Sequence, residues 1–194
     1  MMYKSPHLLI DVADPLSFLA HLQVKSAELK TGARVQRVPV ELRPAPAELI
    51  DVDHPFWAQR WVRAANLADE LCLPLIKPSL VPWSRKAHEL LCHAHASGLD
   101  ETTRLLDSIF EAFLLKSKDI GRIDILLEIG HSVGLELSET KAVLDIDRYE
   151  KEVADAIEYA GSQKAGAPPV LISGPHHLKD FHNHEVIGTF LGMP

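Results

Sequence analysis

The order of apolar and polar positions divides the chain into strand-like ends and a long helical middle. Residues 7–12 (HLLIDV) are almost continuously apolar, which is typical of a buried strand. Over 15–31 apolar residues recur at every third or fourth position, which predicts a helix, and 34–41 (RVQRVPVE) predicts a second strand. Pro39 has no amide hydrogen to donate, so this second strand should lie at a sheet edge or end there.

Helical periodicity dominates residues 49–161. Asp53 is the expected N-cap of the first helix, and Asp147 with Glu150 resembles the capping box of the last. Trp83 is expected in the buried stripe of a helix between them. The further helices are predicted over 83–97, over 100–115, over 122–133, from Ser138, and up to Gly161.

The C-terminal part returns to strand-like patterns. PVLIS within AGAPPVLISG (165–174) predicts a strand, HHLKDF (176–181) a short partner strand, and EVIGTFLG (185–192) a closing helix. The whole order is β-α-β, a helical block, then β-β-α. It predicts an α/β chain in which residues 1–48 and 162–194 form a thioredoxin-like fold and 49–161 form an all-helical insertion domain.

Composition and charge argue against several classes of partner. The chain has 194 residues and a net charge of −7, from 20 Lys and Arg against 27 Asp and Glu, and its basic residues form no cluster. A nucleic-acid partner is therefore not expected. No apolar run approaches the roughly 18 residues of a membrane span, and the N-terminus predicts a first strand rather than a signal peptide. We therefore expect a cytoplasmic protein with no membrane partner, in which Cys72 and Cys92 are reduced thiols.

Four segments in this order resemble the DsbA-like superfamily. They are DVADPLSFLAH (11–21), WSRKAHELLCHAHASG (83–98), FEAFLLKSKDIGRIDILLEIGHSVGLE (110–136) and GAPPVLISG (166–174). The superfamily includes DsbA- and FrnE-type thiol oxidoreductases, 2-hydroxychromene-2-carboxylate isomerases and kappa-class glutathione transferases. The resemblance implies a thioredoxin fold with a helical insertion, and a small-molecule or thiol/peptide ligand. It leaves open whether the chain is a monomer or a homodimer.

The active-site motif departs from that of the superfamily. Where relatives carry C-P-x-C or S-P-x-S, this chain carries Asp14-Pro15-Leu16-Ser17. Asp14 stands at the position of the attacking cysteine or catalytic serine, and Ser17 at that of the second cysteine. Without a thiolate to attack and another to resolve, dithiol–disulfide exchange is not expected there.

Two interpretations of Asp14 follow. Its position before Pro15 suits a helix N-cap, because the carboxylate accepts free amide hydrogens and proline fits the first helical position. Alternatively, Asp14 faces a pocket as a catalytic base, an orienting carboxylate or a metal ligand. Ser17 is either a helix-start hydroxyl or a nucleophile.

The resemblance also implies ligand-contacting positions elsewhere. Ala167-Pro168 matches the pre-proline and cis-proline pair of the family, with the adjacent Pro169 leaving open which bond is cis. With Pro15, these residues and Asn183 are the expected ligand contacts. His184 is expected to approach Asp14 and assist catalysis.

A glutathione cofactor is doubtful. Isomerases and transferases carry G-x-D-R where this chain reads His182-Asn183-His184-Glu185, so an acid replaces the arginine that helps to hold glutathione carboxylates. The cofactor is therefore left open.

Three functions remain from the sequence. The first is a small-molecule isomerase or transferase without a thiol of its own. The second is a non-catalytic peptide- or protein-binding module that uses the cis-proline groove. The third is a metal-binding protein, since His88, Cys92 and His95 share a helix face and other histidines crowd the C-terminal part, although no metal ligand is assigned.

Overall fold

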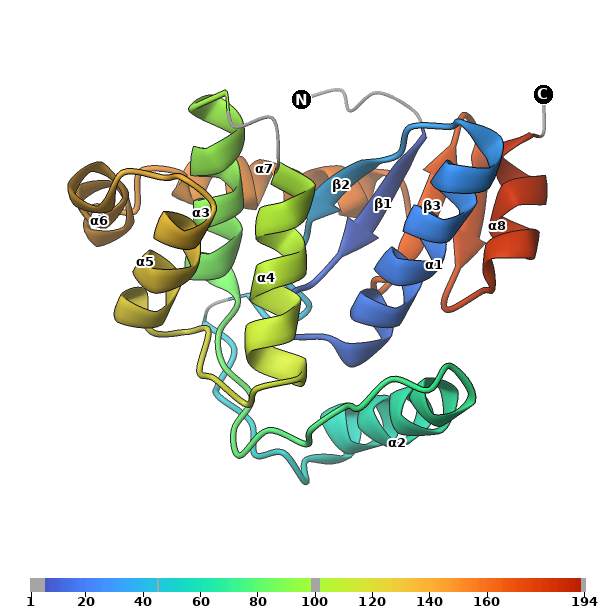
Figure 1. Ribbon diagram of the computed structural model, residues 1–194, viewed down its shortest axis with the longest axis horizontal. Coiled ribbons are helices and arrows are strands. Elements are labelled where there is room, and N and C mark those ends of the chain that lie inside the picture. The colour runs from blue at the N-terminus through green and yellow to red at the C-terminus, as the bar shows by residue number, and fades with distance from the viewer. Residues whose placement is uncertain (1–5, 45, 99–101, 193–194) are drawn as a thin grey trace.

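The computed structural model describes residues 6–44, 46–98 and 102–192 and shows a small sheet flanked by helices (Figure 1). The elements follow the predicted order. They are β1 His7–Ile10, α1 Pro15–Thr31, β2 Gln36–Pro39, α2 Pro55–Glu70, α3 Arg85–Ala96, α4 Thr102–Leu114, α5 Ile123–Ser132, α6 Leu137–Asp145, α7 Glu150–Ser162, β3 Val170–Ser173, β4 His176–Lys179 and α8 His184–Leu191.

The four strands form one mixed sheet in the order β2-β1-β3-β4. β1 pairs in parallel with β2, with Leu9 opposite Val38. β3 runs antiparallel to both β1 and β4, with Leu9 opposite Val170. The strand that carries Pro39 is an edge strand, as its missing amide hydrogen predicts.

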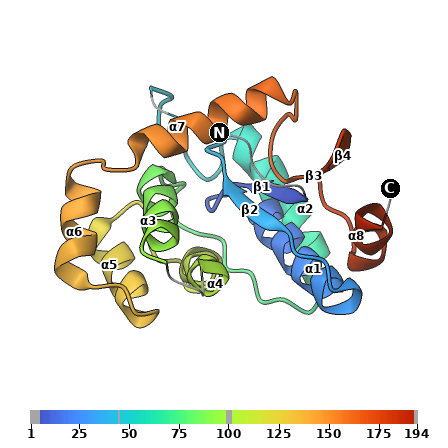
Figure 2. The same ribbon diagram turned by 90° about the horizontal axis from the view of Figure 1, so that it is seen from above.

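Helices cover both faces of the sheet (Figure 2). Leu9, Val170 and Ile172 point to one face and pack with Ala156 and Ala160 of α7. Neighbouring strand residues point the opposite way, because side chains alternate along a strand, and pack with α1 and α8. The result is a three-layer arrangement with the start of α1 at the C-terminal end of β1.

Of the helices between β2 and β3, α7 covers the sheet and the others separate into two parts. Helices α3 to α6 pack around a shared apolar core that includes Leu90, Leu105, Phe110 and Leu126. Helix α2 stands apart from this bundle and lies across the N-terminal end of α1 (Figure 1). It buries only Trp57, Ala64 and Ala68, of which the two alanines permit a close approach.

Three local predictions are wrong. The N-cap of α2 is His54, whose Nδ1 accepts the Phe56 amide hydrogen, and not Asp53. The N-cap of α7 is Tyr149, while Asp147 adopts a positive φ and pairs with Lys86. Trp83 precedes α3 and is 50% exposed, so it is absent from the buried stripe of that helix.

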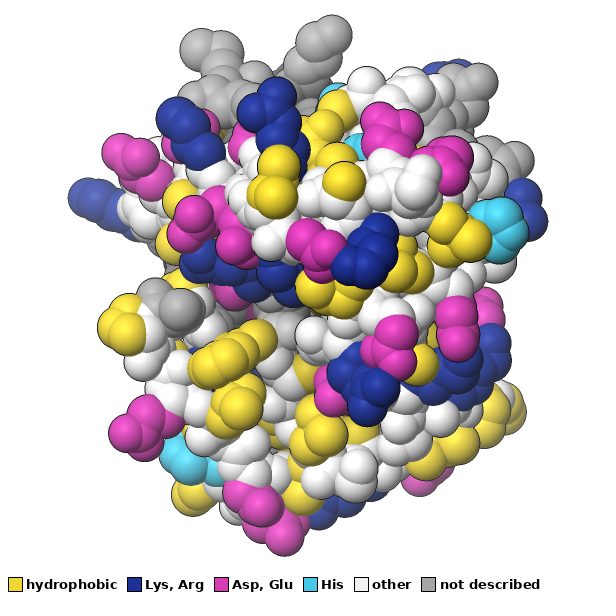
Figure 3. Space-filling model, turned by 90° about the vertical axis from the view of Figure 1, so that its left-hand side faces the viewer, with side chains coloured by type: hydrophobic (Ala, Val, Ile, Leu, Met, Phe, Trp, Pro, Cys, Tyr) yellow, Lys and Arg dark blue, Asp and Glu magenta, His cyan; other side chains and the backbone are white. Residues whose placement is uncertain are grey.

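No helix in the described ranges is long and apolar enough to span a membrane. Figure 3 shows the side of the molecule where α5 and α6 lie, with acidic, basic and apolar side chains interspersed.

Candidate functional site

The carboxylate of Asp14 is buried at the joint between β1 and α1. Its Oδ2 atom accepts hydrogen bonds from the backbone nitrogen of Ser17 at 2.8 Å and from Ser17 Oγ at 2.7 Å. Asp14 is therefore the N-cap of α1, with Pro15 buried at the first helical position, as the sequence predicts for the cap. None of its side-chain surface is exposed.

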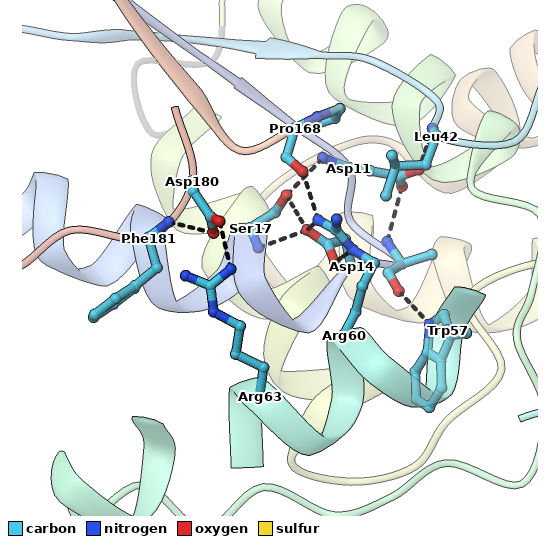
Figure 4. Close-up of polar contacts among 11 residues, drawn as sticks. Asp11, Asp14, Ser17, Leu42, Trp57, Arg60, Arg63, Pro168, Asp180 and Phe181 are labelled. Atoms are coloured by element: carbon cyan, nitrogen blue, oxygen red, sulfur yellow. Dashed lines mark hydrogen bonds and ion pairs between the residues drawn. The ribbon is translucent and has the colours of Figure 1, made fainter. Parts of the chain in front are cut away.

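A guanidinium from α2 completes the surroundings of this carboxylate (Figure 4). Arg60 Nε donates to Asp14 Oδ1 at 2.7 Å and Nη2 donates to Oδ2 at 2.8 Å. Nη2 also donates to the carbonyl oxygen of Pro168 at 2.5 Å. Burial opposes the charge of Arg60, but the hydrogen bond and charge of Asp14 outweigh it and raise the arginine pKa. One side chain thus joins α2, α1 and the segment before β3.

Ser17 is fully enclosed. Its hydroxyl donates to Asp14 and accepts the Asp11 amide hydrogen at 3.2 Å, and none of the residue is exposed. Both its donor and its acceptor are thus used inside the chain. The arrangement favours the helix-start role of Ser17 over that of a nucleophile.

Asp11, directly after β1, also stabilises the connection between β1 and α1. Its carboxylate oxygens accept from the amides of Ala13 at 3.0 Å and Leu42 at 2.7 Å, which ties the β1–α1 connection to the chain after β2. Burial raises the pKa of this carboxyl, but the neighbouring His88 and these amides outweigh it and lower the pKa. Asp11 therefore stays ionised as a structural anion.

The cis peptide bond lies between Pro168 and Pro169. Pro169 is thus the residue that follows the cis bond, one position later than the Ala167-Pro168 pairing. Ala167 is exposed and Pro168 is buried. The residue before the cis bond, Pro168, has no amide hydrogen, and its carbonyl already accepts from Arg60.

His184 and Asn183 lie elsewhere, which corrects the expectation that His184 approaches Asp14. The backbone nitrogen of His184 donates to Gln23 Oε1 at 2.9 Å, and its ring contacts Lys30. Gln23 is nine residues beyond Asp14 on α1, about 13 Å along the helix axis. Asn183 is the N-cap of α8 and accepts the Val186 amide hydrogen at 3.0 Å. The closing helix packs along the side of α1 and not over its N-terminus.

Two further residues of α2 make polar contacts near this site, one with the residue before Asp14 and one with the residue after β4 (Figure 4). Trp57 Nε1 donates to the carbonyl oxygen of Ala13 at 3.3 Å. Arg63 forms an ion pair with Asp180, which follows β4. Trp57, Arg60 and Arg63 are spaced by three and form one polar seam along α2.

A small cavity lies beside this seam. It has a volume of about 30 Å³ and is lined by residues that include Asp11, Leu42, Trp57 and Ser84. A volume of this size holds a water molecule or two and no larger ligand. The Asp14 carboxylate does not line it.

Neither cysteine lies at the site. Cys72 is exposed and Cys92 is half-buried, and both are free. Burial, with the nearby Glu152 and Glu89, raises the pKa of Cys92 to about 12, so its thiol stays protonated. Within the described ranges no group of three or more His, Cys, Asp or Glu side chains could hold a metal ion, and this includes the face with His88, Cys92 and His95.

A family model described as DSBA-like thioredoxin domain matches residues 9–188, nearly the whole chain. The chain belongs to the DsbA-like thioredoxin-domain family. A curated relative, the uncharacterized protein YwbO of Bacillus subtilis (strain 168), is 28% identical over 173 residues, which cover 84% of each chain.

Solved structures of DsbA-like proteins share this fold. A probable DsbA oxidoreductase from Streptomyces coelicolor aligns with a TM-score of 0.82 at 19% identity, over 96% of this chain and 87% of the other. A 2-hydroxychromene-2-carboxylate isomerase aligns at 0.76 with 13% identity, over 95% and 91%. The cytosolic disulfide reductase DsbM from Pseudomonas aeruginosa, solved with GSH, aligns at 0.67 with 18% identity, over 97% and 93%. Solved structures with this fold thus include oxidoreductases and an isomerase.

Sequence reasoning missed Arg60 in this DsbA-family chain. Helical periodicity points to the apolar side chains of a helix, and Arg60 is not one of the buried apolar residues of α2. The available signal is the spacing of Trp57, Arg60 and Arg63 by three, which places them on one side of a helix. Their partners, however, come from residues far away in the sequence.

Proposed function

We propose that this DsbA-family chain is not a dithiol oxidoreductase and that it acts on a small molecule, in the manner of the isomerase or transferase branch. One observation carries the proposal. By the resemblance, the position of the family's attacking cysteine falls on Asp14, whose carboxylate is buried and bound in a bidentate pair by Arg60. A carboxylate cannot attack a disulfide, and Ser17 supplies no resolving thiol.

The backbone beside the cis bond argues against peptide binding. In a groove of this kind, an extended peptide pairs with both the amide hydrogen and the carbonyl of the residue before the cis-proline. Here that residue is Pro168, which has no amide hydrogen and whose carbonyl accepts from Arg60. A small molecule needs neither contact, so the proposal favours it over the peptide-binding module.

The metal-binding alternative has less support than the small-molecule enzyme and the peptide-binding module. No candidate ligand group occurs among the described residues. The histidines nearest the C-terminus serve structural contacts: His184 with Gln23, and His182 with the Lys179 carbonyl at 2.9 Å.

We further propose a cytoplasmic location, in line with two free thiols and no disulfide. DsbM, which is described as cytosolic, shows that a protein of this fold can work there. No nucleic-acid or membrane partner is proposed, and a homodimer stays a prediction that a sizing experiment decides.

Two assays test the proposal. In an insulin-reduction assay with dithiothreitol or glutathione, the chain should give no turnover above the uncatalysed rate. In parallel, thermal-shift titrations with glutathione and a panel of aromatic carboxylic acids should reveal a small-molecule ligand. Robust insulin reduction would refute the non-redox assignment, and a flat response to every small molecule would refute the small-molecule assignment.

A further inference from the structure

Four hydrogen-bond donors converge on the Asp14 carboxylate. Two come from the guanidinium fork of Arg60, one from the Ser17 amide and one from the Ser17 hydroxyl, at 2.7 to 2.8 Å. The fork geometry of arginine matches the two oxygens of any carboxylate and does not select that of aspartate. Asp14 therefore fills a site that has the donor arrangement of a carboxylate receptor.

The charges around Arg60 favour a monoanion as the occupant. Asp14, Asp180 and Asp11 all act on the guanidinium electrostatically. If Asp14 were displaced, the charges of Asp180 and Asp11 would still act on the guanidinium, and a doubly charged phosphate would be repelled more strongly than a carboxylate. The planar shape of the fork points to the same class of ligand.

Helix α2, which carries Arg60, is attached through this polar seam and through a short apolar contact made by Trp57, Ala64 and Ala68. Trp57 binds the Ala13 carbonyl and Arg63 pairs with Asp180. The Arg63–Asp180 pair is about half exposed, at 49% and 43% of the two side chains, so solvent weakens it. Few of the apolar side chains of α2 are buried, and segments with few such contacts open at the lowest free-energy cost.

We propose that Asp14 is an internal occupant of a carboxylate-binding site, and that an organic carboxylic acid takes its place on Arg60 as α2 moves away from α1. The proposal deepens the proposed function, because it names the ligand class, and it rests on the same Asp14–Arg60 pair. The tethered Asp14 competes at a high effective concentration, so wild-type affinity for a simple acid is in the millimolar range or weaker.

Replacement of the internal carboxylate by an amide tests the receptor directly. Asp14→Asn keeps the shape and the N-cap but leaves Arg60 without its counter-charge. Acetate and benzoate should then raise the melting temperature of Asp14→Asn, with an apparent affinity at least about tenfold higher than for the wild type, because the competitor is gone. Acetamide, benzamide and sodium chloride serve as controls and should not reproduce the effect.

Two matched variants assign the effect to Arg60. The Asp14→Asn/Arg60→Gln double variant should lose the response to carboxylates. Asp180→Asn frees the exposed Arg63 and should gain no response, because that guanidinium is about half exposed and water competes for it. A folded Asp14→Asn protein that responds no more than the wild type or the double variant overturns the proposal.

If Asp14→Asn folds neither with nor without acetate, an experiment on the wild-type protein tests the proposal instead. Hydrogen exchange of residues 55–70 should accelerate in concentrated benzoate and not in benzamide, and Arg60→Gln should abolish the difference. Trp57 and Trp61 are stacked with centroids 5.3 Å apart, so their fluorescence reports the same movement. Unchanged exchange and fluorescence overturn the proposal. The stabilisation of Asp14→Asn by carboxylates tests only the hydrogen-bond donors of Arg60 and Ser17. It is therefore expected even if the wild type proves to act on no small molecule.

Discussion

Arg60 and Asp14 form two parallel hydrogen bonds although only 17% of the arginine side chain and none of the aspartate side chain is exposed. Removal of one partner leaves the other buried and charged, at a cost of about 3–5 kcal/mol. We therefore expect Arg60→Gln to lower the free energy of unfolding by roughly that amount in urea denaturation.

The exposed pair on the same helix is the control. Arg63→Gln should cost about 1 kcal/mol or less, because Arg63 and Asp180 are half exposed. The Asp14→Asn/Arg60→Gln double variant should be less destabilised than the sum of its single changes. An Arg60→Gln cost no larger than that of Arg63→Gln would show that the buried pair is not a stabilising element.

A cysteine placed at position 14 should be strongly acidic. In Asp14→Cys the thiol would lie at the N-terminus of α1 beside Arg60, and both favour the thiolate. We expect its pKa to be at least about one unit below the usual 8.5. The ultraviolet absorbance of the thiolate as a function of pH measures it, in a Cys72→Ser/Cys92→Ser background. A second variant with Arg60→Gln should raise the pKa, and equal values in both would rule out a role for the guanidinium.

The two natural cysteines should differ widely in reactivity. Cys72 is exposed, whereas burial and nearby acids raise the pKa of Cys92 to about 12. At pH 8 only about one Cys92 in ten thousand is then a thiolate, the reactive form. Titration with a thiol reagent should show one fast and one slow group, and Cys72→Ser should remove the fast one. Loss of the fast group in Cys92→Ser instead would reverse the assignment.

The burial of His21 predicts that the protein loses folding stability in acid. Burial lowers its pKa below the usual 6.5, although Asp107 opposes this. Arg37 Nε donates to Nδ1 at 3.2 Å, which requires the neutral ring, and Nε2 contacts Asp107 at 2.8 Å. Because the folded state binds the proton more weakly than the unfolded state, this contribution to stability is full above pH 6.5 and falls as the pH drops below it.

Nuclear magnetic resonance titration of the imidazole checks this assignment. The midpoint for His21 should lie below 6.5, the usual value for histidine. A His21 midpoint above 6.5 would contradict the neutral ring.

The fold was largely predictable from periodicity. The range of α1 and the order of the helices and strands in the described ranges agree with the apolar pattern, because burial of one helix stripe or strand face leaves a local trace in the sequence. Helix starts were less predictable. His54 and Tyr149 precede helices in place of Asp53 and Asp147, because a cap depends on the path of the preceding loop.

The site was predictable only in part. The sequence places Asp14 at the α1 cap because cap and helix are neighbours in the chain. Arg60 is 46 residues from Asp14 and 108 from Pro168, and nothing local indicates that they meet. The same limit explains His184, whose position depends on how α8 packs along α1 and brings it to Gln23.

The buried pair also constrains the order in which such a site can arise. If the chain descends from a thiol-bearing ancestor, an aspartate that arrived before Arg60 would have been buried without a counter-charge. An arginine that arrived first would have faced a thiolate and stabilised it. The order of substitutions that avoids an unpaired buried charge therefore introduces the arginine before the aspartate. Once both residues are present, Arg60 cannot be exchanged alone without a large loss of stability, whereas Asp14 can be replaced alone only by a residue that keeps a negative charge there, such as a cysteine thiolate.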